Sequence, residues 1–126
     1  MAHAQSIARI REGRSVGRRA PLATLLGELG LPLRTVAEAL AIPERTMHRL
    51  KNAPVVPAVI ADKVARTLDV LARATEVLGT ARAAQQWVIR PNPALAGKTP
   101  LSLLDTSLGW EQVKLVLGRI EHGVPA

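Results

Sequence analysis

Three basic side chains and one amide recur at helical spacing before the middle of the chain. They stand at positions i, i+3, i+4 and i+7 and are Arg45, His48, Arg49 and Asn52. A helix would present all four on one face. Arginine can make a bidentate contact to guanine or hold a phosphate, and asparagine can pair with adenine. The spacing therefore predicts a helix that enters the major groove of DNA.

The residues around this face have the pattern of a helix-turn-helix, which needs small residues at the crossing point and in the turn. Ala37 and Ala41 supply these two positions. Arg34 and Thr35 begin the first of the two helices and are placed to touch phosphates. The apolar residues expected to pin the helices are Val36, Leu40, Ile42, Met47 and Leu50. The candidate DNA-contacting residues are Arg34, Thr35, Arg45, Thr46, His48, Arg49, Lys51 and Asn52.

Two alternatives stay open for this segment. It can be an ordinary helical hairpin whose outer face is solvated and incidentally basic, since short helix-turn-helix patterns give false positives. His48 can likewise be a solvated polar side chain and not a base reader.

The charge of the chain favours an anionic partner. Its 126 residues carry 17 Lys and Arg against 10 Asp and Glu, a net charge of +7. Residues 1–57 hold nine basic and four acidic side chains, whereas residues 58–126 hold eight and six. The excess belongs mainly to the first half. Within it, the arginine-rich segment Ile7–Arg19 is either a phosphate-contacting arm or a disordered tail.

The elements that must position these residues are predicted to be helices throughout. Hydrophobic residues make up 48% of the chain, and Phe and Tyr are absent, so Ala and Leu dominate a composition that favours helix over strand. Pro21, Pro32 and Pro43 each open a short helix. The later helices are expected over residues 60–78, 81–89, from 100 and over 107–121. We expect an all-α fold with a helix-turn-helix DNA-binding region at residues 1–57, basic arm included, and a small helical domain at residues 58–126.

Several function classes are excluded. Without cysteine there is no disulfide, zinc–thiolate site or thiol catalysis. No acid–base pair, activated nucleophile, phosphate loop or metal-ligand spacing occurs, so we expect neither an enzyme nor a cofactor or metal. His3 and His122 are too far apart in sequence to indicate a metal site. No secretory signal or membrane-spanning stretch is found, and we expect a cytoplasmic protein that does not contact a membrane.

The second half carries motifs in a characteristic order. After Trp87 come the turn Pro91-Asn92-Pro93, the segment Gly97-Lys98-Thr99-Pro100, then Leu103-Leu104-Asp105-Thr106 and finally Arg119-Ile120-Glu121-His122-Gly123. Over roughly residues 64–124 this order resembles the toxin-binding domain of Xre/MbcA/ParS antitoxins. The preceding helix-turn-helix is similar to the Xre-type DNA-binding half that accompanies this domain.

The resemblance implies a bacterial type II toxin–antitoxin system with a RES-class, NAD⁺-consuming toxin as partner. The C-terminal region would cover the toxin's active site, and the N-terminal half would bind operator DNA to repress its own operon. The anionic groups of Glu121 or of the chain end would take the place of NAD⁺ phosphates beside toxin arginines. The implied toxin-binding residues are Arg119, Glu121, His122, Gly123, Val124, Pro125 and Ala126.

The remaining motif residues are expected to hold the shape of this domain. Trp87 and Trp110 are read as anchors of the core, and Gly97 as a residue with positive φ. Asn92 and Asp105 would satisfy backbone groups in turns, and Pro100 would follow a helix cap. The alternative function is a stand-alone helix-turn-helix transcriptional regulator without a toxin. A homodimer through the C-terminal half is expected, because palindromic operators are read by two-fold symmetric proteins. Residues 58–126 would thus serve toxin binding and dimerisation, and the antitoxin dimer would form part of a larger toxin–antitoxin complex.

Overall fold

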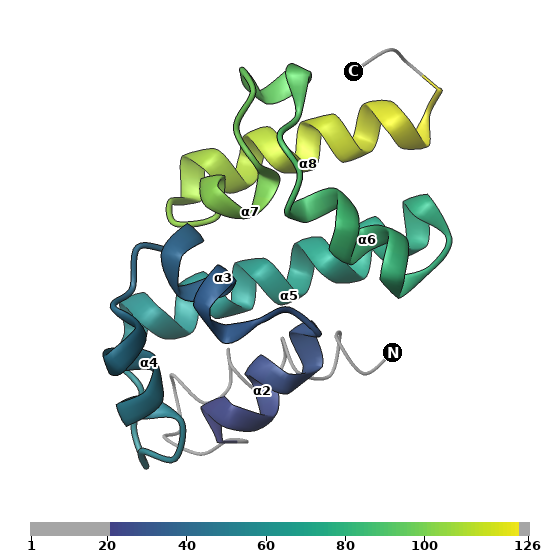
Figure 1. Cartoon of the computed structure of the whole chain (residues 1–126). Coiled ribbons are helices and arrows are strands. Elements are labelled where there is room, and N and C mark those ends of the chain that lie inside the picture. The colour runs from purple at the N-terminus through teal and green to yellow at the C-terminus, as the bar shows by residue number, and fades with distance from the viewer. Residues whose placement is uncertain (1–20, 124–126) are drawn as a thin grey trace.

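The computed structural model describes residues 21–123, and within this range it contains helices and no strand (Figure 1). The all-α prediction is confirmed. The helices are α2 (Leu22–Leu29), α3 (Leu33–Ala39), α4 (Glu44–Leu50), α5 (Ala58–Leu78), α6 (Ala81–Val88), the 3-10 turn η1 (Pro93–Leu95), α7 (Pro100–Leu103) and α8 (Ser107–Glu121).

Prolines mark the beginnings of the helices in the first half. Pro21, Pro32 and Pro43 were expected at the first position of their helices and instead lie one residue before it, at the N-cap. Pro21, Pro32, Pro43 and Pro57 are N-cap residues with ψ between 136° and 147°. Each therefore precedes the first helical turn, where the missing N–H of proline costs no hydrogen bond. The proline at position 57 also starts α5 at Ala58, two residues before the predicted beginning.

Side-chain oxygens cap the N-termini of the helices in the second half. Thr80 and Thr99 accept hydrogen bonds from the N–H groups of Ala83 and Ser102, both at 3.1 Å. Thr106 caps α8 by accepting from the N–H of Gly109 at 3.0 Å. These bonds satisfy amides that have no partner within the helix. Asp105 was expected to satisfy backbone groups in the turn before α8. The side chain that accepts from a backbone amide here is that of the next residue, Thr106.

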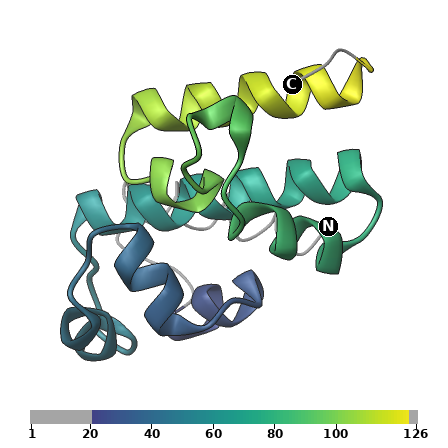
Figure 2. The same cartoon turned by 45° about the horizontal axis from the view of Figure 1, so that its top comes forward.

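The long helix α5 lies at the centre of the molecule. Helices α2 and α4 lie on one side of it and α8 on the other, as both views show (Figures 1 and 2). α5 packs against α2, α6 and α8, and α3 also contacts α7. The buried apolar residues of both halves form one continuous core. The predicted regions 1–57 and 58–126 thus share their interior, and the boundary at residue 57 stays a prediction.

Polar contacts add to this shared core. The ammonium group of Lys63 in α5 donates to the carbonyl of Leu40 at 2.7 Å. Gln85 in α6 donates to the carbonyl of Leu29 at 3.4 Å. Arg66 donates to the carbonyls of Leu104 and Asp105 at 2.9 and 3.1 Å. Each bond joins segments that are far apart in the sequence, so α5 and α6 fix the position of both halves.

Candidate functional site

The segment α3–turn–α4 has the packing that the sequence predicts. The two helices contact one another, and the turn residue Ala41 has φ of 56°. The amide of Ile42 donates to the carbonyl of Ala37 at 2.9 Å, which closes the turn. The residues predicted to pin or cross the helices are all buried, namely Val36, Ala37, Leu40, Ile42, Met47 and Leu50.

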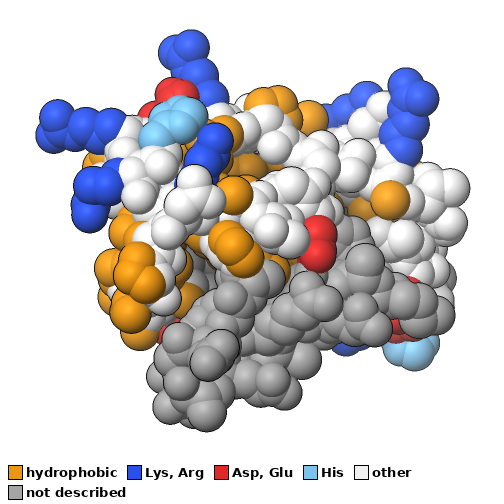
Figure 3. Space-filling view, turned by 90° about the horizontal axis from the view of Figure 1, so that it is seen from below, with side chains coloured by type: hydrophobic (Ala, Val, Ile, Leu, Met, Phe, Trp, Pro, Cys, Tyr) orange, Lys and Arg blue, Asp and Glu red, His pale blue; other side chains and the backbone are white. Residues whose placement is uncertain are grey.

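The outer face of α4 exposes three of the four predicted reading residues, Arg45, His48 and Arg49. Within residues 21–123 neither arginine has an ion-pair partner, whereas His48 lies 4.0 Å from the Glu44 carboxylate. Figure 3 shows Lys and Arg side chains gathered near a histidine on the side of the molecule where α4 lies. A basic, unneutralised surface of this kind can approach a phosphate backbone.

Asn52 was predicted on the same helical face, and this placement is wrong. α4 ends at Leu50, and Asn52 lies exposed in the turn that follows. This turn is closed by the amide of Ala53, which donates to the carbonyl of Leu50 at 3.2 Å.

The other predicted DNA contacts differ in their exposure. Arg34 is exposed and pairs with Glu38 one turn later at 3.2 Å. Thr35, Thr46 and Lys51 are half-buried. The carbonyl of Lys51 accepts a hydrogen bond from the amide of Ala23 at 3.1 Å, so the end of α4 is tied to α2.

The two tryptophans lie on the core but are not fully buried. Trp87 shares a cavity of about 400 Å³ with the turn at residues 91–93. The indole N–H of Trp110 donates to the Asp69 carboxylate at 3.0 Å, and the Lys114 ammonium lies 3.8 Å from the centre of the ring. Trp110 therefore links α8 to α5 through a polar bond as well as through packing.

The turn between α6 and α7 is closed by its own backbone. Asn92 accepts from the amide of Ala94 through its side chain at 2.9 Å, which confirms its expected role. Its backbone N–H donates to the carbonyl of Lys98, and its carbonyl accepts from Gly97, both at 3.0 Å. Gly97 has φ of 80°, as predicted, and the preceding Ala96 has φ of 57°. Pro100 is buried at the start of α7.

The predicted toxin-binding residues begin on α8. Arg119 is exposed, and Glu121 is 3.6 Å from Arg73 of α5. His122 and Gly123 are exposed after the helix. Val124, Pro125 and Ala126 lie outside the described residues, as does the Ile7–Arg19 segment.

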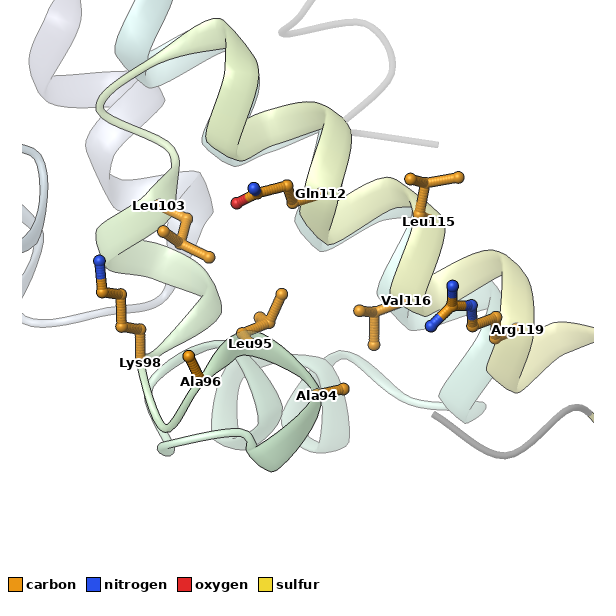
Figure 4. A pocket seen from close by; sticks show the side chains of 9 residues that line it. All are labelled: Ala94, Leu95, Ala96, Lys98, Leu103, Gln112, Leu115, Val116 and Arg119. Carbon is orange, nitrogen blue, oxygen red and sulfur yellow. The ribbon is translucent and has the colours of Figure 1, made fainter.

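Sequence reasoning missed two grooves, which lie on either side of Leu115 on α8. The first, here called the Lys98 groove, has a volume of about 370 Å³ (Figure 4). Its lining consists of Ala94, Leu95, Ala96, Lys98, Leu103, Gln112, Leu115, Val116 and Arg119. The second, here called the His122 groove, measures about 500 Å³. It is lined by Arg73, Glu111, Lys114, Leu115, Gly118, Arg119 and His122.

One signal in the sequence pointed to this surface. Leu108 and Leu115 stand seven residues apart with Gln112 between them, on a face of α8 opposite the buried residues Val113 and Leu117. Both leucines are exposed in the structure, at 71% and 64%. Apolar side chains on the outer face of a helix are informative when they adjoin a groove.

Over residues 21–123 no group of three or more His, Cys, Asp or Glu side chains could hold a metal ion. In the same range, every helix is too short or too polar to cross a lipid bilayer.

Comparisons with known proteins agree with the motifs of the second half. Residues 73–123 match the antitoxin Xre/MbcA/ParS C-terminal toxin-binding domain. An antitoxin Xre of Photorhabdus laumondii is 40% identical over 63 residues, which is 49% of this chain and 43% of the relative. An antitoxin Xre of Pseudomonas putida is 31% identical over 83 residues, covering 65% and 52% of the two chains.

A third relative, an antitoxin Xre of Yersinia enterocolitica, is 31% identical over 97 residues, covering 75% of this chain and 65% of its own. The aligned segments thus span less than two thirds of each relative. Residues 73–123 of this chain are therefore similar to the C-terminal toxin-binding domain of the Xre/MbcA/ParS antitoxins.

Proposed function

We propose that this chain is the antitoxin of a toxin–antitoxin pair and acts by binding, not by catalysis. The observation that carries the proposal is the match of residues 73–123 to a toxin-binding domain. The relatives named as antitoxins support the same role. The partner is a RES-class toxin that consumes NAD⁺, as the order of motifs from Trp87 to Gly123 implies.

The C-terminal region is the part of the chain that blocks the toxin's active site. Its described residues Arg119, His122 and Gly123 are exposed at one end of α8, where they are free to meet a partner. Glu121 is held by Arg73 at 3.6 Å, and this exposed pair is weak enough to be exchanged for a toxin arginine.

Removal of residues 123–126 tests this arrangement. The truncated chain should fold with unchanged helical content, because the last helix ends before the deletion. We expect a RES-class toxin to be encoded in the reading frame beside the gene of this chain. Co-expressed with that toxin, the truncated chain should no longer protect cells. Protection equal to that of the full chain would show that the active site is not covered by this region.

The exposed face of α4 supports a second activity of the same chain, which is binding of its operator as a homodimer to repress the operon. Arg45 and Arg49 provide positive charge without an internal partner in the described range, on a helix whose packing matches a helix-turn-helix. Under the alternative of a stand-alone regulator, the chain would bind DNA and no toxin. Purification of a tagged copy expressed with the neighbouring frame separates the two, since only the antitoxin retains a second protein.

A further inference from the structure

The Lys98 groove combines an apolar floor with two cationic ends. Leu95 and Val116 are buried in its floor, and Leu115 forms an exposed wall. Figure 4 shows Lys98 and Arg119 at opposite ends, with the apolar side chains between them. Such a groove can take an apolar side chain of a partner and place charges on either side of it.

The two cations of this groove have no carboxylate partner among residues 21–123. Its lining contains no Asp or Glu, and over residues 21–123 neither Lys98 nor Arg119 is engaged in an ion pair or side-chain hydrogen bond. Both side chains are exposed. They are therefore available to carboxylates of another molecule.

The His122 groove on the other side of Leu115 gives an internal contrast. There the ammonium of Lys114 lies 2.9 Å from the Glu111 carboxylate and over the Trp110 ring. Arg73 pairs with Glu121. Arg119 lines both grooves, so the contrast lies between Lys98, which has no carboxylate partner among residues 21–123, and Lys114, which Glu111 already neutralises. A partner carboxylate therefore gains more electrostatic attraction beside Lys98 than beside Lys114.

Two other occupants fit the Lys98 groove less well. In both ribbon views α4 and α8 lie on opposite sides of α5 (Figures 1 and 2). Operator DNA bound at α4 would therefore be distant from this groove on α8. A second copy of this chain, docked symmetrically groove to groove, would bring Lys98 and Arg119 near the same cations of its partner, since a two-fold interface pairs a surface with itself. Like charges brought together in this way oppose association.

We infer that the Lys98 groove is a docking site for the toxin, which inserts an apolar side chain flanked by carboxylates that pair with Lys98 and Arg119. This inference rests on the proposed antitoxin function. Arg119 belongs both to the C-terminal toxin-binding region and to the groove, and the contact that the groove adds is made by Lys98, Leu115 and the turn at residues 94–98. It makes toxin binding depend on side chains of the turn at residues 94–98 as well as on α8.

Charge reversal tests the electrostatic part with a matched control. The variant Lys98→Glu/Arg119→Glu should bind the purified toxin of the neighbouring frame at least about 100-fold more weakly, because attraction becomes repulsion at both ends. The control Arg45→Glu/Arg49→Glu changes the net charge equally at exposed positions of α4. It should bind toxin within about threefold of the wild type while losing operator DNA.

Two exposed leucines of α8 test the apolar part. Leu115→Ser should weaken toxin binding about tenfold, because Leu115 lines the groove. Leu108→Ser removes a similarly exposed leucine that does not line the Lys98 groove. This variant should change the affinity for the toxin less than threefold. Both variants should keep the wild-type melting temperature, since neither side chain is buried.

The outcomes separate the inference from the proposed function. If the wild type binds the toxin and the groove variants bind it equally well, or lose no more than the α4 control, the groove is not the docking site. If Leu115→Ser instead turns a dimer into a monomer with unchanged toxin affinity, the groove joins two copies and the inference is wrong. If the wild type itself binds no toxin, the antitoxin function fails first.

Discussion

Ala41 holds a left-handed backbone conformation, with φ of 56°, at the turn between α3 and α4. This conformation costs an L-residue about 1–2 kcal/mol, whereas glycine adopts it freely. The methyl group is exposed and adds little packing. Ala41→Gly should therefore raise the free energy of unfolding by about 0.5–1 kcal/mol, measured by denaturant titration.

The opposite effect is expected for the same substitution within a helix. Ala72 lies in the interior of α5, where glycine costs about 1 kcal/mol relative to alanine. Ala72→Gly should lower the free energy of unfolding. Equal destabilisation by both variants would show that the turn at Ala41 is not strained.

Two glycines of α8 make a second contrast at the scale of single residues. A Cβ atom at Gly109 would overlap the backbone carbonyl of Leu103, whereas at Gly118 the nearest atom is the Arg73 guanidinium at 4.0 Å. Gly109→Ala should lower the free energy of unfolding by about 1–3 kcal/mol, because α7 and α8 must move apart. Gly118→Ala should raise it by up to about 1 kcal/mol. Thermal melts measure both changes. If Gly109→Ala raises the melting temperature as Gly118→Ala does, α7 does not approach α8 as closely as described.

At the scale of elements, α4 is the helix proposed to read DNA. Arg45→Ala/Arg49→Ala should weaken operator binding about 10- to 1,000-fold, since each arginine is expected to supply a base or phosphate contact. The slope of log K against log salt should fall by about 1 for each phosphate contact that is lost.

Arg82→Ala is the matched control for this pair, because Arg82 is exposed on α6 at a distance from α4. It should leave both the affinity and the salt slope nearly unchanged. Fluorescence anisotropy over a range of salt concentrations measures both quantities. An unchanged slope in the double variant would place the DNA contacts on another face.

Most helix boundaries could be predicted because local residues set them. Proline precedes four helices, and two of these, α2 and α5, also end at a glycine with positive φ, Gly30 and Gly79. Gly123, also with positive φ, follows the C-cap of α8. Asn52 lies beyond the end of α4 because the helix stops at Leu50, and spacing alone does not show where a helix ends. The Lys98 groove could not be predicted, since it forms where the turn at residues 94–98 packs across α8, and no local pattern specifies that contact.

At the scale of the whole molecule, one core joins the two halves. The structure therefore predicts a single cooperative unfolding transition. Trp87 and Trp110 both belong to the second half, so their fluorescence reports that half, whereas circular dichroism reports all helices. The two denaturant curves should coincide. A dichroism change that precedes the fluorescence change would mean that α2–α4 unfold independently.

The central claim is that this molecule neutralises a toxin that consumes NAD⁺. The most direct test is the cellular NAD⁺ content after induction of the toxin encoded in the neighbouring reading frame, with and without this chain. We predict that NAD⁺ falls with the toxin alone and stays at the uninduced level when this chain is co-expressed. An equal fall in both cultures, with this chain present in its folded form, would contradict the claim.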